Sequence, residues 1–377
     1  MIETGNMSSS DKNFRTLKRI ERYPGKLIFE GKAFLDLTSN DYLGLSENLQ
    51  LQKDFLSNLP DDRFLLGSLS SRLLTGNCGF KEEFENYIAR SYGKEACLLY
   101  NSGYHINTGL LPALAGKNDF ILADKLVHAS IIDGIRLARC PWQRFRHNDL
   151  DDLEGKLKKA SEKYKKIYVV TEGIFSMDGD IPDLHSLLTL KNKYPFFLYI
   201  DEAHSFGVRG NMGLGMCEEL EILEHVDIII ATFGKALAGE GAFAVCNNYI
   251  RQHLINHSRS LIYSTAAAPL STLWTQHIFK HVLQMEQKRK YLQDISFQLR
   301  SRLQDHFSIL GRSHILPLLF ENIEQCQDMI KVLHERGIYV LPIRYPTVPI
   351  NSPRIRLSLT AALSYSDLEK IYGALLA

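Results

Sequence analysis

The stretch Asp227–Gly241, DIIIATFGKALAGEG, is the part of the sequence that decides the fold. Its apolar, β-branched run Ile228–Ile230 predicts a buried strand, and Gly234 allows a sharp turn where that strand ends. The turn would hold Lys235 at the rim of a sheet. An amine among apolar neighbours loses hydration, so its pKa falls, which suits imine chemistry. Taken alone, a lysine after a strand is far more often an ordinary surface residue.

A second stretch, Pro195–Ser205 (PFFLYIDEAHS), repeats this pattern earlier in the chain. The apolar run Phe196–Ile200 ends in Asp201, and His204 follows. Parallel sheets place ligands outside the carboxyl ends of their strands, so Asp201 and Lys235 are predicted to face one crevice. A carboxylate there can keep a pyridinium nitrogen protonated while the lysine forms an imine with an aldehyde. These are the two fixed points of a pyridoxal phosphate (PLP) site, although Asp201 alone would equally suit a helix N-cap.

A series of motifs follows in order from Thr38 to Ala361: TSNDYLGLS, NSGYHINTG, VHASIIDG, TEGIFSMDGD, DEAHSFGVRG, ATFGKALAG, YSTAAAP and PTVPINSPRIRLSLTA. In this order they resemble the α-oxoamine synthases, PLP-dependent acyltransferases of aminotransferase fold type I. The resemblance covers nearly the whole chain and implies a homodimer with shared active sites. PTVP and the compact length resemble most the branch that condenses L-alanine with a pimeloyl thioester, carried by CoA or acyl carrier protein, into 8-amino-7-oxononanoate in biotin biosynthesis.

The hydrophobic pattern predicts strands that alternate with helices in the middle of the chain. Residues 11–21 are predicted to form an amphipathic helix, and a hairpin is expected around Gly31 and Lys32. Seven strands are then predicted at 97–100, 120–123, 144–146, 167–170, 196–200, 228–231 and 242–246. Helical patterns between most of them indicate an α/β fold with a mostly parallel, doubly wound sheet. A long helix at 271–310, followed by three strands around a helix at 323–336, indicates a smaller α+β part.

Composition excludes several other classes of function. The length of 377 residues predicts more than one core, with divisions at 1–50, 51–265 and 266–377. Lys and Arg number 44 against 43 Asp and Glu, so no basic surface for nucleic acid is expected. Six scattered cysteines without a CxxC pair fit a reducing cytosol rather than disulfides or a metal site. No leader and no membrane-spanning run is visible, which predicts a soluble, cytoplasmic protein without a membrane partner.

The cofactor phosphate is predicted to bind where the first strand of the sheet meets a helix. Asn101–Tyr104 follows that strand, and backbone N–H groups at a helix start bind phosphate well. An ordinary N-cap is the alternative for this segment. The resemblance implies main-chain phosphate contacts from Gly103 and Tyr104 and a hydroxyl contact from Thr232. It also implies that Thr265 reaches the phosphate of the neighbouring subunit's cofactor.

The resemblance further implies the catalytic set. Lys235 would hold the cofactor and then take the Cα proton of the amino acid, while Asp201 keeps the ring protonated. His204 would support acid–base steps and, with Ser176, lie near the phenolic oxygen of the cofactor. His128 would stack over the ring and help to position the acyl substrate, although a lone histidine is more often structural.

Substrate binding is assigned to a second group of residues by the same resemblance. A substrate carboxylate needs a guanidinium fork, and Arg356 in PRIRLS is the best match for it. Asn40 and Thr347 match substrate-contacting positions, and Arg15 matches an N-terminal arginine of related enzymes more loosely. Arg354 lies in the same pattern, and any one of these arginines alone would more often be a solvated surface residue.

Three positions depart from the family pattern, and they bear on substrate choice more than on the type of reaction. Leu69 replaces a glycine, Lys81 stands where relatives commonly carry a histidine, and Leu214 replaces an arginine. A sister synthase that uses glycine or serine with another acyl-CoA is therefore the first alternative. A non-catalytic paralogue is the second, and the retained lysine, aspartate and histidine argue against it.

Overall fold

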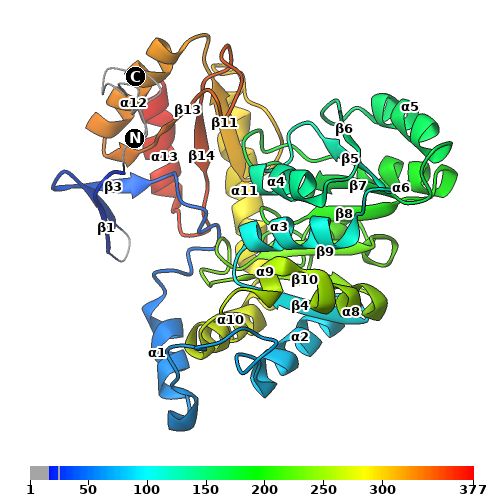
Figure 1. Ribbon diagram of the computed structural model, residues 1–377. Coiled ribbons are helices and arrows are strands. Elements are labelled where there is room, and N and C mark those ends of the chain that lie inside the picture. Colours follow the sequence, from blue (N-terminus) through cyan, green and yellow to red (C-terminus); the bar gives the residue numbers. More distant parts are fainter. Residues whose placement is uncertain (1–16, 24–25) are drawn as a thin grey trace, which may run out of the picture.

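The computed structural model describes residues 17–23 and 26–377, and a seven-stranded sheet forms its centre (Figure 1). Its strands are arranged in the order β4-β10-β9-β8-β7-β5-β6. The five strands from β9 to β6 are parallel, whereas β10 runs antiparallel to both β9 and β4. Their bounds are Ala96–Tyr100 (β4), Phe120–Asp124 (β5), Trp142–Phe145 (β6), Ile167–Glu172 (β7), Phe197–Asp201 (β8), Ile228–Thr232 (β9) and Ala242–Cys246 (β10). The sheet confirms the predicted fold type I architecture and all seven predicted strands.

Both faces of this sheet are covered by helices, as the continuous apolar runs of its strands require. Successive residues point to opposite faces, so Val169 and Val170 belong to two different buried clusters. One face packs on α3 (Gly103–Leu114), α4 (Ala129–Ala138) and α8 (Asn248–His257). The other packs on α2 (Gly79–Ser91), α5 (Leu150–Ser161), α6 (Leu184–Lys193) and α10 (Pro269–Val282). The short elements are α1 (Leu49–Ser57), η1 (Asp61–Arg63), α7 (Met216–Glu219), η2 (Leu223–His225) and α9 (Arg259–Ile262).

The predicted N-terminal helix is wrong where the structure describes it. Residues 11–16 lie outside the described part, and Ile20–Tyr23 forms strand β1. Leu17 and Ile20, two apolar residues of the expected stripe, are exposed, so no packing supports a helix. Instead β1 pairs with β2 (Lys26–Phe29), which pairs with β3 (Lys32–Asp36) in the predicted hairpin.

The C-terminal part contains a three-stranded sheet and completes the sheet of the N-terminal hairpin. The order β11-β14-β13 joins Ile315–Leu319, Arg354–Ser358 and Pro342–Ile343. Strand β12 (Ile338–Tyr339) runs parallel to β3, so the hairpin lies beside α12 (Ile323–Glu335) and α13 (Tyr365–Leu375) (Figure 1). In the described part of the chain, no helix has the length and apolar character that a membrane span needs.

The long helix predicted at 271–310 is two helices, α10 and α11 (Glu286–Leu303). The break at 283–285 is stabilised by Arg289, which is 1% exposed. Its guanidinium donates at 2.6 Å to the carbonyl of Val282 in the last turn of α10, which also accepts from the backbone N–H of Met285. A charged residue in the second helix therefore stabilises the interruption. Residues 283–285 include no glycine or proline, so the break could not be predicted from the sequence.

Candidate active site

Lys235 and His204 meet at the carboxyl ends of β9 and β8. Nζ of Lys235 lies 2.8 Å from Nε2 of His204, whose Nδ1 lies 2.7 Å from the hydroxyl of Tyr42. Desolvation lowers the pKa of Lys235 to about 8, although the negative charges of Asp201 and Glu172 oppose the shift. Desolvation, followed by the charges of Lys235 and Arg356, lowers the pKa of His204 well below its usual value. The imidazole beside the lysine is therefore neutral at physiological pH.

Asp201 ends β8 with its carboxylate held on both sides. Oδ2 accepts a hydrogen bond of 3.1 Å from Nδ2 of Asn107, and Oδ1 accepts one of 3.0 Å from the backbone of Ala203. Asn107 is itself oriented by the hydroxyl of Tyr199, which donates to its Oδ1. The next helix along the chain begins only at Met216, so Asp201 is not an N-cap. The carboxylate has a fixed orientation in a buried setting, as a partner for a ring nitrogen requires.

His128 lies at the start of α4 and is anchored by two polar neighbours. Its Nδ1 lies 2.8 Å from Oγ of Ser130, and its backbone N–H donates to Oε1 of Glu172 at 2.6 Å. Ser130 also accepts from Asn107, so His128 and Asp201 belong to one hydrogen-bonded network. Burial, and then the charge of Asp201, raises the pKa of Glu172 well above its usual value. No role for Glu172 could be predicted from its position in the sequence, and the structure shows that its carboxyl group fixes the backbone of His128.

Arg356 on β14 reaches the same site from the C-terminal part of the chain. Its Nη1 and Nη2 donate to Oδ1 of Asn40 at 3.2 and 3.3 Å, and Nη2 also donates to the hydroxyl of Tyr42 at 3.1 Å. Nε donates to the carbonyl of Ser176 at 2.6 Å. Arg356 forms no ion pair with any residue in 17–23 or 26–377, so its charge is free to bind an anionic substrate. Tyr42 links this guanidinium to His204 and was missed, although it lies only two residues after Asn40.

The residues predicted to cradle a phosphate come together in part. Gly103 begins α3, and a Cβ placed there would lie 3.5 Å from Cβ of Thr232, so the helix start faces that side chain closely. Tyr104 follows, but its exposed side chain turns to the carboxylate of Asp133 and leaves only its backbone at the helix start. Thr265 is exposed, and its carbonyl accepts from Nδ2 of Asn101 at 2.7 Å.

The remaining predicted residues lie at the edge of this arrangement or outside it. Thr347 is exposed in a turn, where its N–H donates to the carbonyl of Arg344 at 2.9 Å. Arg15 lies outside the described residues. Arg354 lies on the same face of β14 as Arg356 and forms an ion pair with Asp178.

Comparisons with known proteins agree with this geometry. The family model for class I and II aminotransferases matches residues 32–375. An 8-amino-7-oxononanoate synthase of Chlorobaculum parvum is 45% identical over 364 residues, covering 95% of this chain and 93% of that protein. The chain belongs to the α-oxoamine synthases. Like other enzymes of this family, it is a PLP-dependent acyltransferase.

Solved structures of this family share the fold of the present α-oxoamine synthase. A serine palmitoyltransferase from S. paucimobilis with bound PLP has a TM-score of 0.88 at 26% identity, covering 95% of this chain and 90% of that chain. An 8-amino-7-oxononanoate synthase from Francisella tularensis has a TM-score of 0.77 at 28% identity, covering 91% of this chain and 96% of that chain.

The donor set of this α-oxoamine synthase fits PLP. A partly neutral amine (Lys235), an oriented carboxylate (Asp201) and a helix start beside Thr232 at Gly103 lie at the carboxyl ends of the strands. When bound, PLP supplies an electron sink for the amino-acid Cα. The Lys235 amine can accept the Cα proton, and the neighbouring neutral His204 keeps it within hydrogen-bond reach of a second base. Asp201 can hold a proton on the ring nitrogen, while Arg356 can hold a carboxylate.

The shifted pKa of Lys235 predicts how PLP attachment to the ligand-free protein depends on pH. We expect the rate to rise with pH and to level off above about 8, because only the neutral amine attacks an aldehyde and this amine is neutral above that pH. An unshifted lysine would keep accelerating toward about 10.4. The absorbance change on mixing PLP with the PLP-free protein at a series of pH values measures the rate. N-acetyl-lysine under the same conditions corrects for the titration of PLP itself, and a midpoint near 10 in the protein would contradict the expectation.

Proposed function

We propose that this α-oxoamine synthase condenses L-alanine with a pimeloyl thioester to give 8-amino-7-oxononanoate, CO2 and a free thiol, as a step of biotin biosynthesis. The observation that carries the proposal is the 45% identity to the Chlorobaculum parvum protein of that name, over almost the full length of both chains. A protein of the same name from Haemophilus ducreyi is 42% identical over 370 residues. These identities exceed those to the serine palmitoyltransferases, which are 26–29%.

The site supports this chemistry through the distribution of its charges. The unpaired guanidinium of Arg356 is a receptor for the amino-acid carboxylate, and Asn40 and Tyr42 keep it oriented. A series of hydrogen bonds through His204 and Tyr42 links Lys235 to Arg356. The proposed proton acceptor, Lys235, and the proposed carboxylate receptor, Arg356, therefore belong to one hydrogen-bonded network. The Cα of a bound alanine would lie between them.

We also propose a homodimer in which Thr265 serves the partner's cofactor. Ser71 forms an isolated β-bridge with Thr265, so the 64–74 segment and Thr265 belong to one surface. That segment exposes an unusual number of apolar side chains: Phe64, Leu65, Leu66, Leu69, Leu73 and Leu74. Exposed apolar groups concentrated in this way mark an interaction surface, and a second copy of the chain would cover it. His128, Thr347 and Arg15 are proposed to contact substrate or cofactor once both subunits are assembled.

Product analysis tests the proposed reaction directly. The purified PLP-loaded protein is given alanine with pimeloyl-CoA and, separately, alanine with pimeloyl-acyl carrier protein. We expect release of CO2 and thiol in equal amounts, and formation of 8-amino-7-oxononanoate detected by mass spectrometry. The faster of the two thioesters identifies the carrier. No release with either carrier would overturn the proposed substrates.

A sister activity with glycine or serine is the second candidate. The observation that favours it is the closer structural match to a serine palmitoyltransferase, with a TM-score of 0.88 against 0.77 for the Francisella tularensis synthase. The same assay with serine or glycine and palmitoyl-CoA separates the two candidates. Turnover of serine in preference to alanine would support the second candidate, and a protein that binds no PLP would point to a non-catalytic paralogue.

A further inference from the structure

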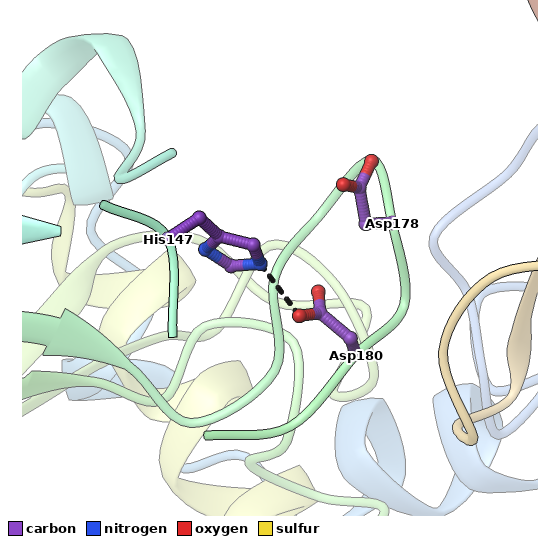
Figure 2. Close-up of side chains that lie close together, drawn as sticks. All are labelled: His147, Asp178 and Asp180. Carbon is purple, nitrogen blue, oxygen red and sulfur yellow. Dashed lines mark hydrogen bonds and ion pairs between the residues drawn. The ribbon is translucent and has the colours of Figure 1, made fainter. Parts of the chain in front are cut away.

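His147, in the loop after β6, has a carboxylate on each side of its ring. Nδ1 lies 2.8 Å from Oδ1 of Asp124, which ends β5 and is fully buried. Nε2 lies 2.6 Å from Oδ2 of Asp180, and Figure 2 shows the ring edge directed at that carboxylate. An ionised carboxylate only accepts hydrogen bonds, so each ring nitrogen must carry a hydrogen. Burial opposes this charge, but the hydrogen bonds to Asp124 and Asp180 outweigh it and raise the pKa of His147 to about 10.

The same residues do not suit a metal ion. His147, Asp178 and Asp180 offer ligand atoms within 4.8 Å of one another (Figure 2). A metal would need a lone pair on an imidazole nitrogen, and both nitrogens of His147 already face acceptors. Asp178 is also engaged, because it forms an ion pair with Arg354. The arrangement is an imidazolium hydrogen-bonded to two aspartates. We call His147, Asp124 and Asp180 the clamp, because together they connect the loop after β6 to the end of β5 and to the 176–180 loop.

This clamp binds the 176–180 loop at Asp180. Other residues of the loop contact arginines of β14, one of which lies in the active site. Asp178 pairs with Arg354, and the carbonyl of Ser176 accepts from Nε of Arg356. Gly179 has φ of +63°, and a Cβ there would lie 2.3 Å from the carbonyl of Ile315, so the loop is pressed against β11. The loop therefore connects the large sheet, through His147, to two arginines of β14.

We propose that His147 is a positioning residue that acts through Asp180 and the 176–180 loop to set the direction of the Arg356 guanidinium. The inference rests on the proposed role of Arg356 as the receptor for the amino-acid carboxylate. The Ser176 carbonyl accepts from Nε of Arg356, while Nη1 donates to Asn40 and Ser358 and Nη2 donates to Asn40 and Tyr42. The substrate carboxylate would bind on the side of Nη1 and Nη2. A guanidinium binds a carboxylate through two parallel bonds, so a small rotation of the loop would weaken binding of the amino acid.

Variants of this clamp should bind the amino acid more weakly while their affinity for the acyl thioester stays nearly unchanged. In His147→Gln, we expect the dissociation constant for alanine to rise about 10-fold or more, because misplacement of about 1 Å is costly, while the KM for the thioester stays within about twofold. Alanine binding is read from the absorption spectrum of the PLP-loaded protein. This readout needs no turnover, so the test stays informative if the proposed acyl substrate is wrong. Glycine or serine replaces alanine if either is the amino acid that binds.

Asp180→Asn keeps the shape of the side chain and serves as the second variant, should His147→Gln fold poorly. If His147 acts through Asp180, the double variant should bind alanine no more weakly than either single variant. His306→Gln is the matched control and should bind alanine normally, because this histidine is exposed and no carboxylate contact to it is found among residues 17–23 and 26–377. The proposal would be overturned if the losses of alanine affinity in the two single variants added up in the double variant. Equal losses of amino-acid and thioester affinity would also overturn it, because they would indicate a general structural role for His147.

The charge state of His147 offers a test that requires no substrate. Nitrogen-15 labelling of histidine, with His147→Gln to assign the signals, should show two protonated ring nitrogens at pH 8. Signals of a singly protonated ring, or a bound metal at one equivalent per chain, would contradict the clamp.

Discussion

Lys235→Ala is expected to lower kcat by at least about 10³-fold, because it would remove both the proposed proton acceptor of the reaction and the proposed covalent tether of PLP. Acid–base catalysis by one positioned group accounts for about 10²–10⁴-fold by itself. The absorption band of lysine-bound PLP should disappear, although the phosphate contacts at the start of α3 would still allow weak binding of PLP. The measurements are steady-state release of thiol and the absorption spectrum after addition of PLP.

Lys290→Ala is the matched control for this variant. Its side chain is 72% exposed and pairs with Glu286 one helical turn away, so its loss should leave both spectrum and rate unchanged. A retained band in Lys235→Ala would show that another lysine holds the cofactor. That outcome would remove the centre of the proposed mechanism.

Asp201→Asn is expected to lower kcat by about 10²–10³-fold while PLP remains attached to Lys235. The amide has the shape of the carboxylate and can still accept from Asn107. It lacks the charge that holds a proton on the ring nitrogen, so the cofactor would withdraw electrons less effectively. The measurement is thiol release with the variant fully loaded with PLP, as judged from its spectrum.

A cofactor analogue tests whether the lost rate in Asp201→Asn comes from the missing charge on the ring nitrogen. PLP methylated at the ring nitrogen is permanently positive, so it should restore part of the lost rate in Asp201→Asn. Asp294→Asn, at an exposed carboxylate on α11, serves as the control and should behave as the unchanged protein does. Equal rates in Asp201→Asn and the unchanged protein would contradict the assigned role of this carboxylate.

The parallel sheet could be predicted because its strands are continuous apolar runs that are buried on both faces. Lys235 and Asp201 could be predicted to share a crevice because Asp201 ends one such strand, Lys235 follows another after a short turn, and the carboxyl ends of parallel strands share an edge. In the described residues 17–21 of the predicted N-terminal helix, periodicity failed because it indicates only a possible apolar face and does not show whether a partner exists to bury that face. It failed again at 283–285, where Arg289 from the following helix stabilises the break.

The polar connections within the site were beyond prediction from sequence. Tyr42 meets His204 across 162 positions, and Arg356 meets Tyr42 across 314. Such contacts depend on how separate elements pack, and a residue type alone does not specify its partner. Asn107 is a further example, because an asparagine inside a helix carries no signal that it orients a carboxylate on a neighbouring strand.

The pairing of β3 with β12 has a consequence for how the protein is made. Leu35 is synthesised about 300 residues before its partner Ile338. Strand β3 therefore presents an open edge until β12 has been synthesised, and an open edge favours mispairing with other chains.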